Sequence, residues 1–198
     1  MKTIDLSKSG PGQFRRTRSR LFELIWMIFE VIFVSNPLQI SSALRVAVLR
    51  LFGAKIGKKG FFRNFHIKFP WNFEAGDHCW IGERVWIHNQ DQVTIGRNVA
   101  LSQEVYITTG SHDIHRTMDL VTKPVRIEDG AWLTSRCIVT MGVVIGSNTV
   151  VTPGSVVYKS LEPGWVCGGN PVTFLRYRWT AEHREPPPPE FDPLHESH

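Results

Sequence analysis

The chain has 198 residues, a formal net charge of +5 and 42% hydrophobic residues. This length suits one domain with appendages, and the apolar content is enough for a core. The mild positive charge does not argue for nucleic acid as a partner. The three cysteines, Cys79, Cys137 and Cys167, are far apart and lack CxxC spacing. They indicate free thiols in a reducing compartment rather than a disulfide framework or a zinc site.

Residues 1–52 are predicted to form a basic N-terminus followed by a helical cap. Six lysine or arginine side chains in residues 1–20 stand against a single acid. Residues 21–34 predict a helix that is apolar on all sides except at Glu23 and Glu30, which are seven apart and share a face. This run is too short to cross a bilayer, which needs about 20 apolar residues. No small-residue cleavage site follows it, so it does not resemble a signal peptide.

A second helix is predicted over residues 41–52. The pattern sorts five of its residues by face: Leu44, Val48 and Leu51 on one apolar face, with Arg45 and Arg50 off it. Two compatible interpretations of the helical pair stay open. The helices either cap the open end of the following fold, or make a peripheral membrane contact in which basic residues 15–20 meet anionic lipid.

From the middle of the chain onward, apolar residues recur every six positions. Steps of six from Ile127 reach Leu133, Val139, Ile145, Val151 and Val157. An earlier run steps from Ala75 to Ile87 and, after two extra residues, continues from Ile95 to Ile107. A period of six fits neither an α-helix nor an alternating strand. It is typical of a parallel β-helix, in which three six-residue sides close each coil.

Small residues complete this pattern. The fifth position of each six-residue repeat is small or modest in size, as at Ala131 and Ser155. A glycine often follows the inward aliphatic residue, as at Gly57 and Gly96, and is predicted to ease the turn between two sides of the coil. One repeat fails, because residues 88–92 read HNQDQ and place polar groups where the others place apolar ones.

Residues 108–126, TTGSHDIHRTMDLVTKPVR, interrupt the period and are predicted to form an excursion loop. His112 comes immediately after the coil and is a candidate general base, because an imidazole accepts a proton near neutral pH. A loop on a rigid scaffold also gives such a residue access to substrate. His115 is the competitor, able to orient His112 or to bind substrate. Asp113 is adjacent to His112, but adjacency alone does not make a dyad.

The C-terminal part is predicted to leave the coils. Residues 173–179, TFLRYRW, predict a final strand or a short segment that leaves the β-helix. Residues 179–198 contain four consecutive prolines, which remove main-chain donors and fix φ. They predict a flexible or polyproline-II tail.

Several segments agree, in order, with one known family. LFGAKIGKKG, FPWNFEAGDHCWIGERVWIHN, VTIGRNVALSQ, TTGSHD, LVTKPVRIEDGAWL and GGNPV resemble the colanic acid biosynthesis (WcaF-like) acetyltransferases, over roughly residues 14–178. The resemblance implies an all-β fold, a left-handed parallel β-helix of hexapeptide repeats over residues 53–178, with a short N-terminal helical segment. It also implies transfer of acetyl from acetyl-CoA to a hydroxyl of a sugar or glycan intermediate of exopolysaccharide synthesis. No metal is required, and a cytoplasmic homotrimer is expected, with contact at the inner face of the membrane in the second interpretation of the helices.

The resemblance also assigns roles to residues of the catalytic site. His112 matches the catalytic histidine of the family and would take the proton of the acceptor hydroxyl. Asn89 matches a polar residue that faces the acceptor, and His88 and His115 are assigned to acceptor binding beside it. For Asn89 the alternative is a plain turn residue.

A second group of residues is assigned to the acyl donor. Trp132 matches a tryptophan near the acetyl group and the pantetheine arm of coenzyme A. Lys159 and Arg176 resemble the cations that meet its phosphates, and Ser155 in the same C-terminal coils is assigned to the cofactor site. The alternative for Lys159 and Arg176 is a solvated charge.

Two other functions stay open at this point. A metalloenzyme of the γ-carbonic anhydrase type would use histidines as ligands, and the chain offers His66, His78, His88, His112 and His115. The paired histidine segment on successive coils that such a site needs is missing, however. A non-catalytic β-helix scaffold is the other alternative, and the intact His112 segment argues against it.

Overall fold

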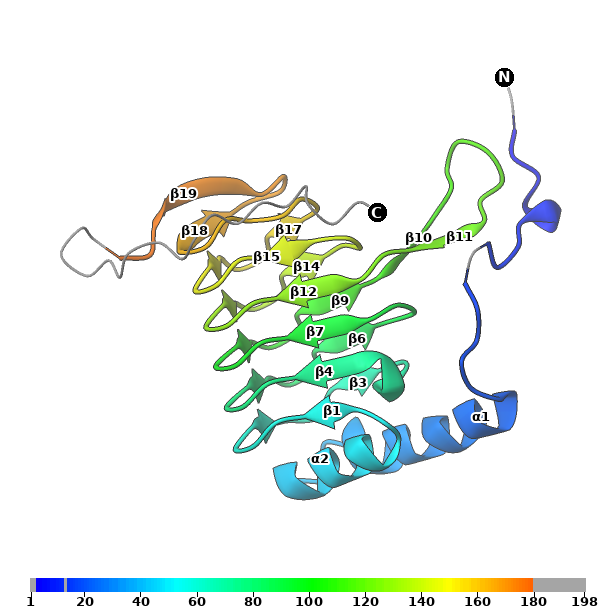
Figure 1. The fold of residues 1–198 in the computed structure, drawn as a ribbon, viewed down its shortest axis with the longest axis horizontal. Coiled ribbons are helices and arrows are strands. Elements are labelled where there is room, and N and C mark those ends of the chain that lie inside the picture. Colours follow the sequence, from blue (N-terminus) through cyan, green and yellow to red (C-terminus); the bar gives the residue numbers. More distant parts are fainter. Residues whose placement is uncertain (1–2, 13, 180–198) are drawn as a thin grey trace.

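The structure is a computed structural model that describes residues 3–12 and 14–179. Its strands are two to five residues long and mostly parallel, and they stack into a solenoid with three flat sheets, A, B and C (Figure 1). The predicted proline-rich tail lies outside the described residues, apart from Trp179.

Each successive coil adds one strand to each sheet. Sheet A comprises β1 (Lys55–Ile56), β4 (Phe73–Ala75), β7 (Val93–Ile95), β12 (Val125–Ile127) and β15 (Val144–Ile145). Sheet B comprises β2 (Phe61–Phe62), β5 (Trp80–Ile81), β8 (Ala100–Leu101), β13 (Trp132–Leu133), β16 (Val150–Val151), β18 (Trp165–Gly168) and β19 (Thr173–Tyr177). Sheet C comprises β3 (His66–Ile67), β6 (Trp86–His88), β9 (Tyr106–Thr108), β14 (Ile138–Val139) and β17 (Val156–Val157). The predicted left-handed parallel β-helix is confirmed.

The hexapeptide positions form continuous apolar columns inside the solenoid. On sheet B the strand register joins Phe62, Ile81, Leu101, Leu133 and Val151 in one column, and all five are fully buried. The fifth positions are buried as well: Cys79, Val85, Val99, Val105, Ala131, Cys137, Val143, Thr149 and Ser155. Burying one aliphatic side chain of this kind stabilises a fold by about 1.5–3 kcal/mol. The six-residue period therefore reflects the repeated filling of one narrow core.

The glycines after the inward isoleucines serve a different purpose from the predicted one. The backbone at Gly57 and Gly96 is not in the left-handed region. A Cβ atom at Gly96 would lie 2.7 Å from the main-chain nitrogen of Asp129 in the next coil. Glycine is needed there because adjacent coils approach closely. The left-handed turn conformation is taken instead by other residues, which have positive φ: Lys59, His78, Arg84, Asn98, Glu104, Arg136 and Asn148.

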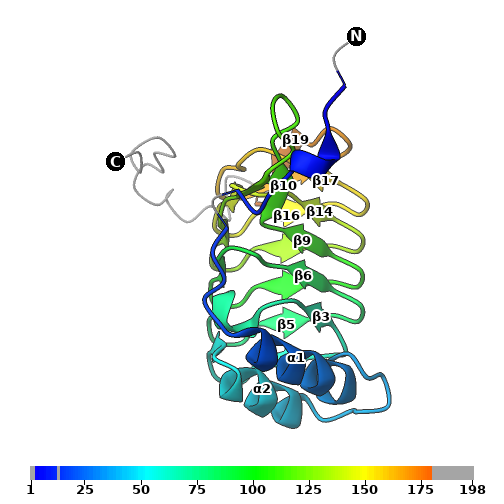
Figure 2. The same ribbon diagram turned by 90° about the vertical axis from the view of Figure 1, so that its right-hand side faces the viewer.

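Helices close the N-terminal end of the solenoid (Figures 1 and 2). Helix α1 (Arg20–Phe29) continues into a π-helical turn, η2 (Glu30–Val34), and α2 (Ser42–Leu51) follows after a linker. The Ser19 and Ser41 hydroxyls cap α1 and α2 by accepting main-chain N–H groups at 3.2 Å. Serine is a preferred residue at this position. The two predicted helices are therefore confirmed.

The inner side of these helices joins the solenoid core. Trp26 and Leu49 are buried in the same apolar cluster as Phe62 and Phe65 of the first coil. The indole Nε1 of Trp26 donates to the carbonyl oxygen of Ile67 at 3.2 Å. The contacts are those of a cap over the open end of the coils. Within the described ranges, every helix is too short or too polar to traverse a bilayer.

The prediction that Arg45 lies off the buried face of α2 is wrong. This arginine is 1% exposed, whereas Leu44 and Leu51 are 42% and 73% exposed. Its guanidinium donates to three main-chain carbonyl oxygens, those of Gln39 at 2.6 Å, Phe62 at 2.8 Å and Val34 at 2.9 Å. Hydropathy alone assigns arginine to the surface. Here the planar guanidinium donates hydrogen bonds to carbonyl oxygens of three segments: the end of η2, the linker and the first coil. The fold places these three oxygens close together.

The C-terminal end of the solenoid is closed by an antiparallel pair. Strand β19 folds back on β18, with Arg176 opposite Val166 and Thr173 opposite Gly168. The predicted final strand at residues 173–179 is confirmed. Its side chains are exposed, so this strand leaves the core rather than adding another coil.

The three cysteines are free and buried, as predicted for thiols outside a disulfide framework. Burial raises the pKa of Cys79 and Cys137, and it raises the pKa of Cys167 to about 11 despite the opposing charge of Lys159. We therefore expect no reaction of the native protein with Ellman's reagent at mildly alkaline pH, because the thiolate is the reactive form. Unfolding in denaturant should release all three thiols, and fast labelling of the native protein would contradict this expectation.

Candidate active site

The interruption of the repeat is a β-hairpin that leaves the corner between sheets C and A (Figures 1 and 2). Strand β10 (Gly110–His112) pairs with β11 (Leu120–Thr122) in antiparallel register. The segment was predicted as a loop over residues 108–126, and the paired strands make it an ordered arm instead. The coil resumes with β12, where Val125 is already buried.

His112 ends strand β10, and its side chain is exposed. The imidazole Nδ1 lies 2.8 Å from the carbonyl oxygen of Met118, across the hairpin. A carbonyl oxygen only accepts hydrogen bonds, so Nδ1 carries the proton of the neutral ring and Nε2 presents a lone pair. The hairpin thus holds an accessible imidazole in the tautomer that a general base requires.

The N-terminal segment, residues 3–12, holds the hairpin from its other side. After a 3-10 turn, η1 (Leu6–Lys8), the Ser9 hydroxyl donates to the same Met118 carbonyl oxygen at 2.6 Å. The main-chain N–H of Gly10 donates to Asp119 Oδ1 at 2.6 Å and lowers the pKa of that carboxyl group. These contacts join residues more than 100 positions apart in sequence, and they fix the carbonyl that orients His112. No local pattern in the sequence predicts them.

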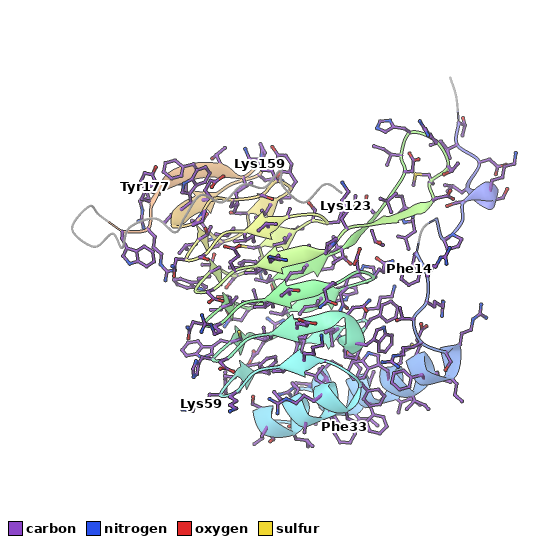
Figure 3. The ribbon with its side chains drawn as sticks, viewed as in Figure 1. Phe14, Phe33, Lys59, Lys123, Lys159 and Tyr177 are labelled. Atoms are coloured by element: carbon purple, nitrogen blue, oxygen red, sulfur yellow. The ribbon has the colours of Figure 1, made fainter. Side chains whose placement is uncertain are left out.

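Residues 14–19 lead along the side of the solenoid to α1 (Figure 1). The ring of Phe14 stacks on Phe69, with ring centroids 6.2 Å apart (Figure 3). Phe69 itself is held through its main chain by Asn89. Phe69 also stacks on Trp71, and the Trp71 ring contacts Phe22 of α1, with centroids 5.5 Å apart. Aromatic packing therefore connects Phe14 to the helical cap.

The other polar residues of the hairpin do not orient His112. The Asp113 carboxylate accepts the main-chain N–H groups of His115 at 3.0 Å and Arg116 at 3.2 Å, which forms a local turn. Asp113 is therefore committed to this turn and does not form a dyad with His112. Adjacency in the sequence alone did not establish one. The His115 side chain is exposed in this turn, and its role as a helper or a substrate ligand stays a prediction.

Asn89 lies inside the corner below the hairpin rather than on the surface. It is fully buried, and Oδ1 accepts the N–H of Phe69 at 3.0 Å. Its Nδ2 donates to the carbonyl oxygens of Phe69 at 2.7 Å and Asn72 at 3.0 Å, at the turn η3 (Pro70–Asn72). No side-chain surface of Asn89 is exposed in this arrangement, and its contact with an acceptor stays a prediction. The contacts favour the alternative of a structural turn residue.

The failed repeat at residues 88–92 now has a physical explanation. Asn89 occupies an inward position, and Thr109 does the same in the next coil; both are fully buried. The Thr109 hydroxyl accepts the main-chain N–H of Asp91 at 2.8 Å. Polar side chains replace aliphatic ones at this corner because they satisfy the main chain of turns that deviate from the regular coil.

His88 is half-buried at the edge of the same corner, and Lys68 lies next to it. The imidazole Nε2 of His88 lies 3.1 Å from Lys68 Nζ. Burial lowers the pKa of His88, and the charge of Lys68 lowers it further. Both effects favour the neutral imidazole, in which Nε2 can accept a hydrogen bond from the Lys68 ammonium group. Sequence reasoning did not find Lys68.

Replacing Lys68 by methionine is expected to raise the pKa of His88, because the nearby positive charge disappears while the burial remains. The pKa should stay below the ordinary value of 6.5. In the native protein the lowered pKa contributes stability that is present above pH 6.5 and is lost as the pH falls below it. A titration of the imidazole protons by NMR checks the shift. The exposed Lys58→Met variant is the control, and an unchanged His88 titration in Lys68→Met would contradict the assignment.

Trp132 lies on sheet B, away from the hairpin corner. It is 44% exposed, and its Nε1 donates to the Ser102 hydroxyl at 3.0 Å. With Phe61, Trp80 and Arg178 it lines a cavity of about 570 Å³. One chain alone therefore does not bring Trp132 to the hairpin corner of His112.

Arg178 is a site candidate that sequence reasoning missed. It lines the cavity beside Trp132, and its Nη1 donates to the carbonyl oxygens of Gly130 at 2.9 Å and Asn148 at 3.1 Å. In the motif TFLRYRW, Arg176 and Arg178 are equivalent by sequence. The fold separates them, because Arg178 reaches across two coils while Arg176 bonds to the adjacent carbonyl of Tyr177.

The other residues assigned to the cofactor lie on the C-terminal coils. Lys159 is exposed after β17, at the end of the solenoid (Figure 3), and Arg176 is exposed on β19. Ser155 is fully buried; its hydroxyl donates to Thr152 O at 2.6 Å and accepts the Gly169 N–H at 3.0 Å. This hydroxyl is therefore committed to holding two turns together, and the cofactor role of Ser155 stays a prediction.

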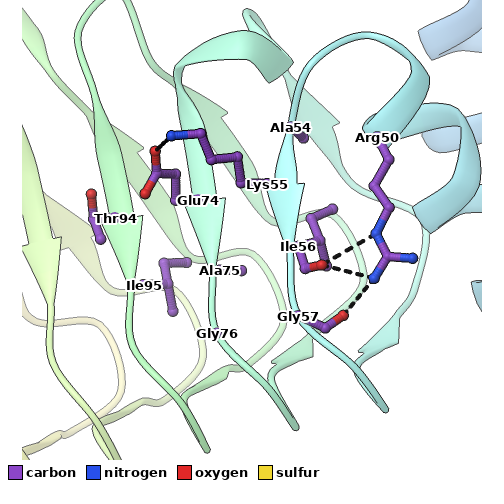
Figure 4. Close-up of a pocket in the computed structure, with 10 residues that line it drawn as sticks. All are labelled: Arg50, Ala54, Lys55, Ile56, Gly57, Glu74, Ala75, Gly76, Thr94 and Ile95. Carbon is purple, nitrogen blue, oxygen red and sulfur yellow. Dashed lines mark hydrogen bonds and ion pairs between the residues drawn. The ribbon is translucent and has the colours of Figure 1, made fainter.

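A second cavity, of about 580 Å³, lies over the first coils of sheet A (Figure 4). Its charged groups are bonded to one another or to the main chain. Lys55 Nζ meets Glu74 Oε1 at 2.6 Å, and Arg50 donates to the carbonyl oxygens of Ile56 and Gly57 at 2.7 Å. Its lining includes Gly57 and Gly76, which follow β1 and β4, and it includes no residue of the hairpin.

The histidines have separate surroundings. His66 Nδ1 lies 3.0 Å from Glu30, His88 faces Lys68, and His112 faces a main-chain carbonyl. His78 occupies a turn with φ of 60°. In residues 3–12 and 14–179 of a single chain, no three histidine, cysteine or acidic side chains come together as a candidate metal site.

A three-sided β-helix of hexapeptide coils with a histidine-bearing hairpin at one corner defines the class of hexapeptide-repeat acyltransferases. The family model described as hexapeptide repeat of succinyl-transferase matches residues 124–159. WcaF of Escherichia coli K12, which is named as a colanic acid biosynthesis acetyltransferase, is 38% identical over 176 residues, covering 88% of this chain and 96% of WcaF. The chain therefore belongs to the WcaF-like family of hexapeptide-repeat acetyltransferases, as the resemblance predicted.

Other relatives agree with this assignment. Galactoside O-acetyltransferase of Escherichia coli K12 is 26% identical over 152 residues, covering 72% of this chain and 71% of that protein. A hexapeptide-repeat acetyltransferase of Vibrio cholerae, solved with acetyl coenzyme A, superimposes with a TM-score of 0.72 at 26% identity. The match covers 81% of this chain and 87% of that one.

Proposed function

We propose that this chain transfers acetyl from acetyl-CoA to a hydroxyl group of a sugar or glycan intermediate in exopolysaccharide synthesis, with His112 as general base. The observation that carries the proposal is the hydrogen bond from His112 Nδ1 to Met118 O, 2.8 Å long. It leaves Nε2 unprotonated on an accessible arm. The names of the relatives, for colanic acid and galactoside acetylation, support the class of acceptor, and the bound acetyl coenzyme A of the Vibrio relative supports the donor.

The residues of the chain then have simple tasks. Acetyl-CoA would supply an acetyl group already activated as a thioester. His112 Nε2 takes the proton of the acceptor hydroxyl as that oxygen attacks, and later returns it to the leaving thiolate. The bond to Met118 O holds the ring in place through both transfers and stabilises its positive charge in between. The Ser9 hydroxyl keeps the same carbonyl in position.

Exposed positive charges on the C-terminal coils are complementary to the phosphate groups of acetyl-CoA. Lys159 and Arg176 are exposed there, and cations of this kind bind phosphate groups. Arg178, beside Trp132 in the cavity on sheet B, is a third candidate. These three cations would hold the nucleotide end of coenzyme A, and Trp132 would contact its acyl arm.

The outer faces of the solenoid support a homotrimer. Four of the five strands of sheet A carry a charged or polar residue outward: Lys55, Glu74, Thr94 and Arg126. Sheets B and C carry large exposed apolar residues instead: Phe61, Trp80 and Trp132 on B, and Trp86 and Ile138 on C. Packing sheet B of one chain near the C–A corner of the next generates a closed ring. It would bring Trp132 of one chain toward His112 of another. Light scattering should give the mass of three chains, and Trp80→Glu should reduce that mass.

The test of the proposed function is a screen of sugar acceptors with acetyl-CoA, followed through the free thiol of the released coenzyme A. Because the protein thiols are buried, the reagent reports the product with little background. Acceptor-dependent release supports the proposal. Absence of release across mono- and oligosaccharides, nucleotide sugars and lipid-linked sugars would refute it and favour a scaffold.

A further inference from the structure

Helix α1 and the π turn η2 present a continuous apolar surface on the side away from the core. Trp26 points inward, and the opposite arc consists of residues that are 41–66% exposed. We call these the helix face: Leu21, Leu24, Ile25, Met27, Ile28, Val31 and Ile32. A helix that is apolar on all sides is normally buried on all sides. A large exposed apolar patch marks an interaction site.

The exposed apolar surface continues beyond the helix. Leu38 and Ile40, in the linker to α2, are 87% and 84% exposed. The helices sit at the end of the solenoid (Figure 1), away from the coils that carry Lys159 and Arg176. This surface is therefore separate from the proposed acetyl-CoA site.

The charges around the helix face are arranged asymmetrically. The two acids of the helix are half-buried and paired, Glu23 with Arg16 at 2.5 Å and Glu30 with His66 at 3.0 Å. The helix face itself carries no charged residue. Three exposed arginines lie at its N-terminal end, Arg15, Arg18 and Arg20. The guanidinium of Arg18 lies over the ring of Phe22, 5.5 Å from its centroid. An apolar strip beside exposed cations is complementary to a bilayer whose headgroups are anionic.

The dimensions fit a helix that lies on a membrane. The helical run from Arg20 to Val34 is about 22 Å long at 1.5 Å per residue, too short for a hydrocarbon core of about 30 Å. A helix lying flat needs only one apolar side, which the helix face supplies. The other side stays packed on the solenoid through Trp26 and Phe22.

We propose that the helix face docks in the interface of a bilayer containing anionic lipid, with Arg15, Arg18 and Arg20 at the headgroups. In a parallel trimer the three helix faces would lie at the same end of the assembly and act together on one surface. The Ser9 and Gly10 contacts would then connect the docked end to the hairpin that carries His112. The proposal does not depend on the proposed function, since binding is measured without turnover.

The test is flotation of the full-length protein with vesicles of phosphatidylcholine, with and without phosphatidylglycerol. Leu24→Gln, Ile28→Gln and Val31→Gln, combined, should lower the partition coefficient on anionic vesicles by on the order of 100-fold. Arg15→Gln, Arg18→Gln and Arg20→Gln, combined, should abolish the preference for anionic over neutral vesicles.

The matched control combines Leu6→Gln, Ile114→Gln and Leu175→Gln, three residues of similar exposure (66%, 65% and 54%) outside the helix face. This control should float like the unmodified protein. Circular dichroism and light scattering confirm that each variant keeps its fold and mass. If the unmodified protein fails to float, or the helix-face variant floats equally well, the proposal is overturned. Loss of mass in the helix-face variant would also overturn it, because the face would then be covered by another chain.

Discussion

His112→Ala is expected to lower kcat/KM for acetyl transfer by about 100- to 10,000-fold, the usual contribution of a general base. The effect should fall mainly on kcat, because the proton transfer is made in the transition state rather than in the bound substrate. The side chain is exposed on the hairpin, so its removal leaves the core intact. Release of coenzyme A thiol with a competent acceptor measures the rate.

The neighbouring histidine provides the control for this variant. His115 lies on the same hairpin and is exposed, but its main chain bonds to Asp113 and not to Met118. His115→Ala should therefore change kcat little and act, if at all, on KM for the acceptor. Equal rates for the unmodified protein and His112→Ala would show that His112 is not the base. An equal loss of kcat in both variants would show that the two histidines act together.

Arg45→Met is expected to destabilise the native protein by about 3–5 kcal/mol. The substitution removes the donors from three carbonyl oxygens in a buried site. Each buried unsatisfied polar group costs about 1–3 kcal/mol, and Val34 O retains a weak partner in the N–H of Phe65 at 3.4 Å. For a chain of this size the loss corresponds to a fall in the melting temperature of roughly 10 °C. Thermal and urea unfolding at fixed protein concentration measure it.

Arg50 offers a matched comparison on the same helix. It also donates to main-chain carbonyl oxygens, those of Ile56 and Gly57, but it is exposed. Water replaces its hydrogen bonds when the guanidinium is removed, so Arg50→Met should cost about 1 kcal/mol or less. If both variants lose the same small amount, the buried position of Arg45 in α2 is incorrect.

The regular part of the fold was predictable because it follows from one repeated constraint. A narrow triangular core accepts one aliphatic side chain per six residues and one small residue at each corner. Ile127, Leu133, Val139 and Ile145 follow this rule, and the structure buries them all. The position of the hairpin was predictable for the same reason, since its residues break the period. His112 was then a candidate from its chemistry and its place next to the coil, and the family resemblance assigned it the role of base.

The polar positions were less predictable, because polar residue types do not reveal their partners. Asn89 and Ser155 looked like ligands of the substrate and cofactor, and both are buried supports of turns. Arg45 looked like a surface residue and is inside. In each case main-chain groups distant in sequence become the partners, and only the folded chain brings them together.

The sequence by itself determined the β-helix, the break in its period, the two N-terminal helices and a histidine placed for access. Only the tertiary structure decided what orients that histidine. Met118 O fixes the tautomer of His112, and Ser9, more than 100 residues away in sequence, holds the same oxygen. The tertiary structure also decided which side of α1 is exposed, because Trp26 is buried in the core and the helix face points to solvent. The physical reason is the same in both cases. The six-residue period shows which side chains point into the core of their own coil. The hydrogen-bond partners of a polar group, and the exposed side of an apolar helix, depend instead on packing between distant segments.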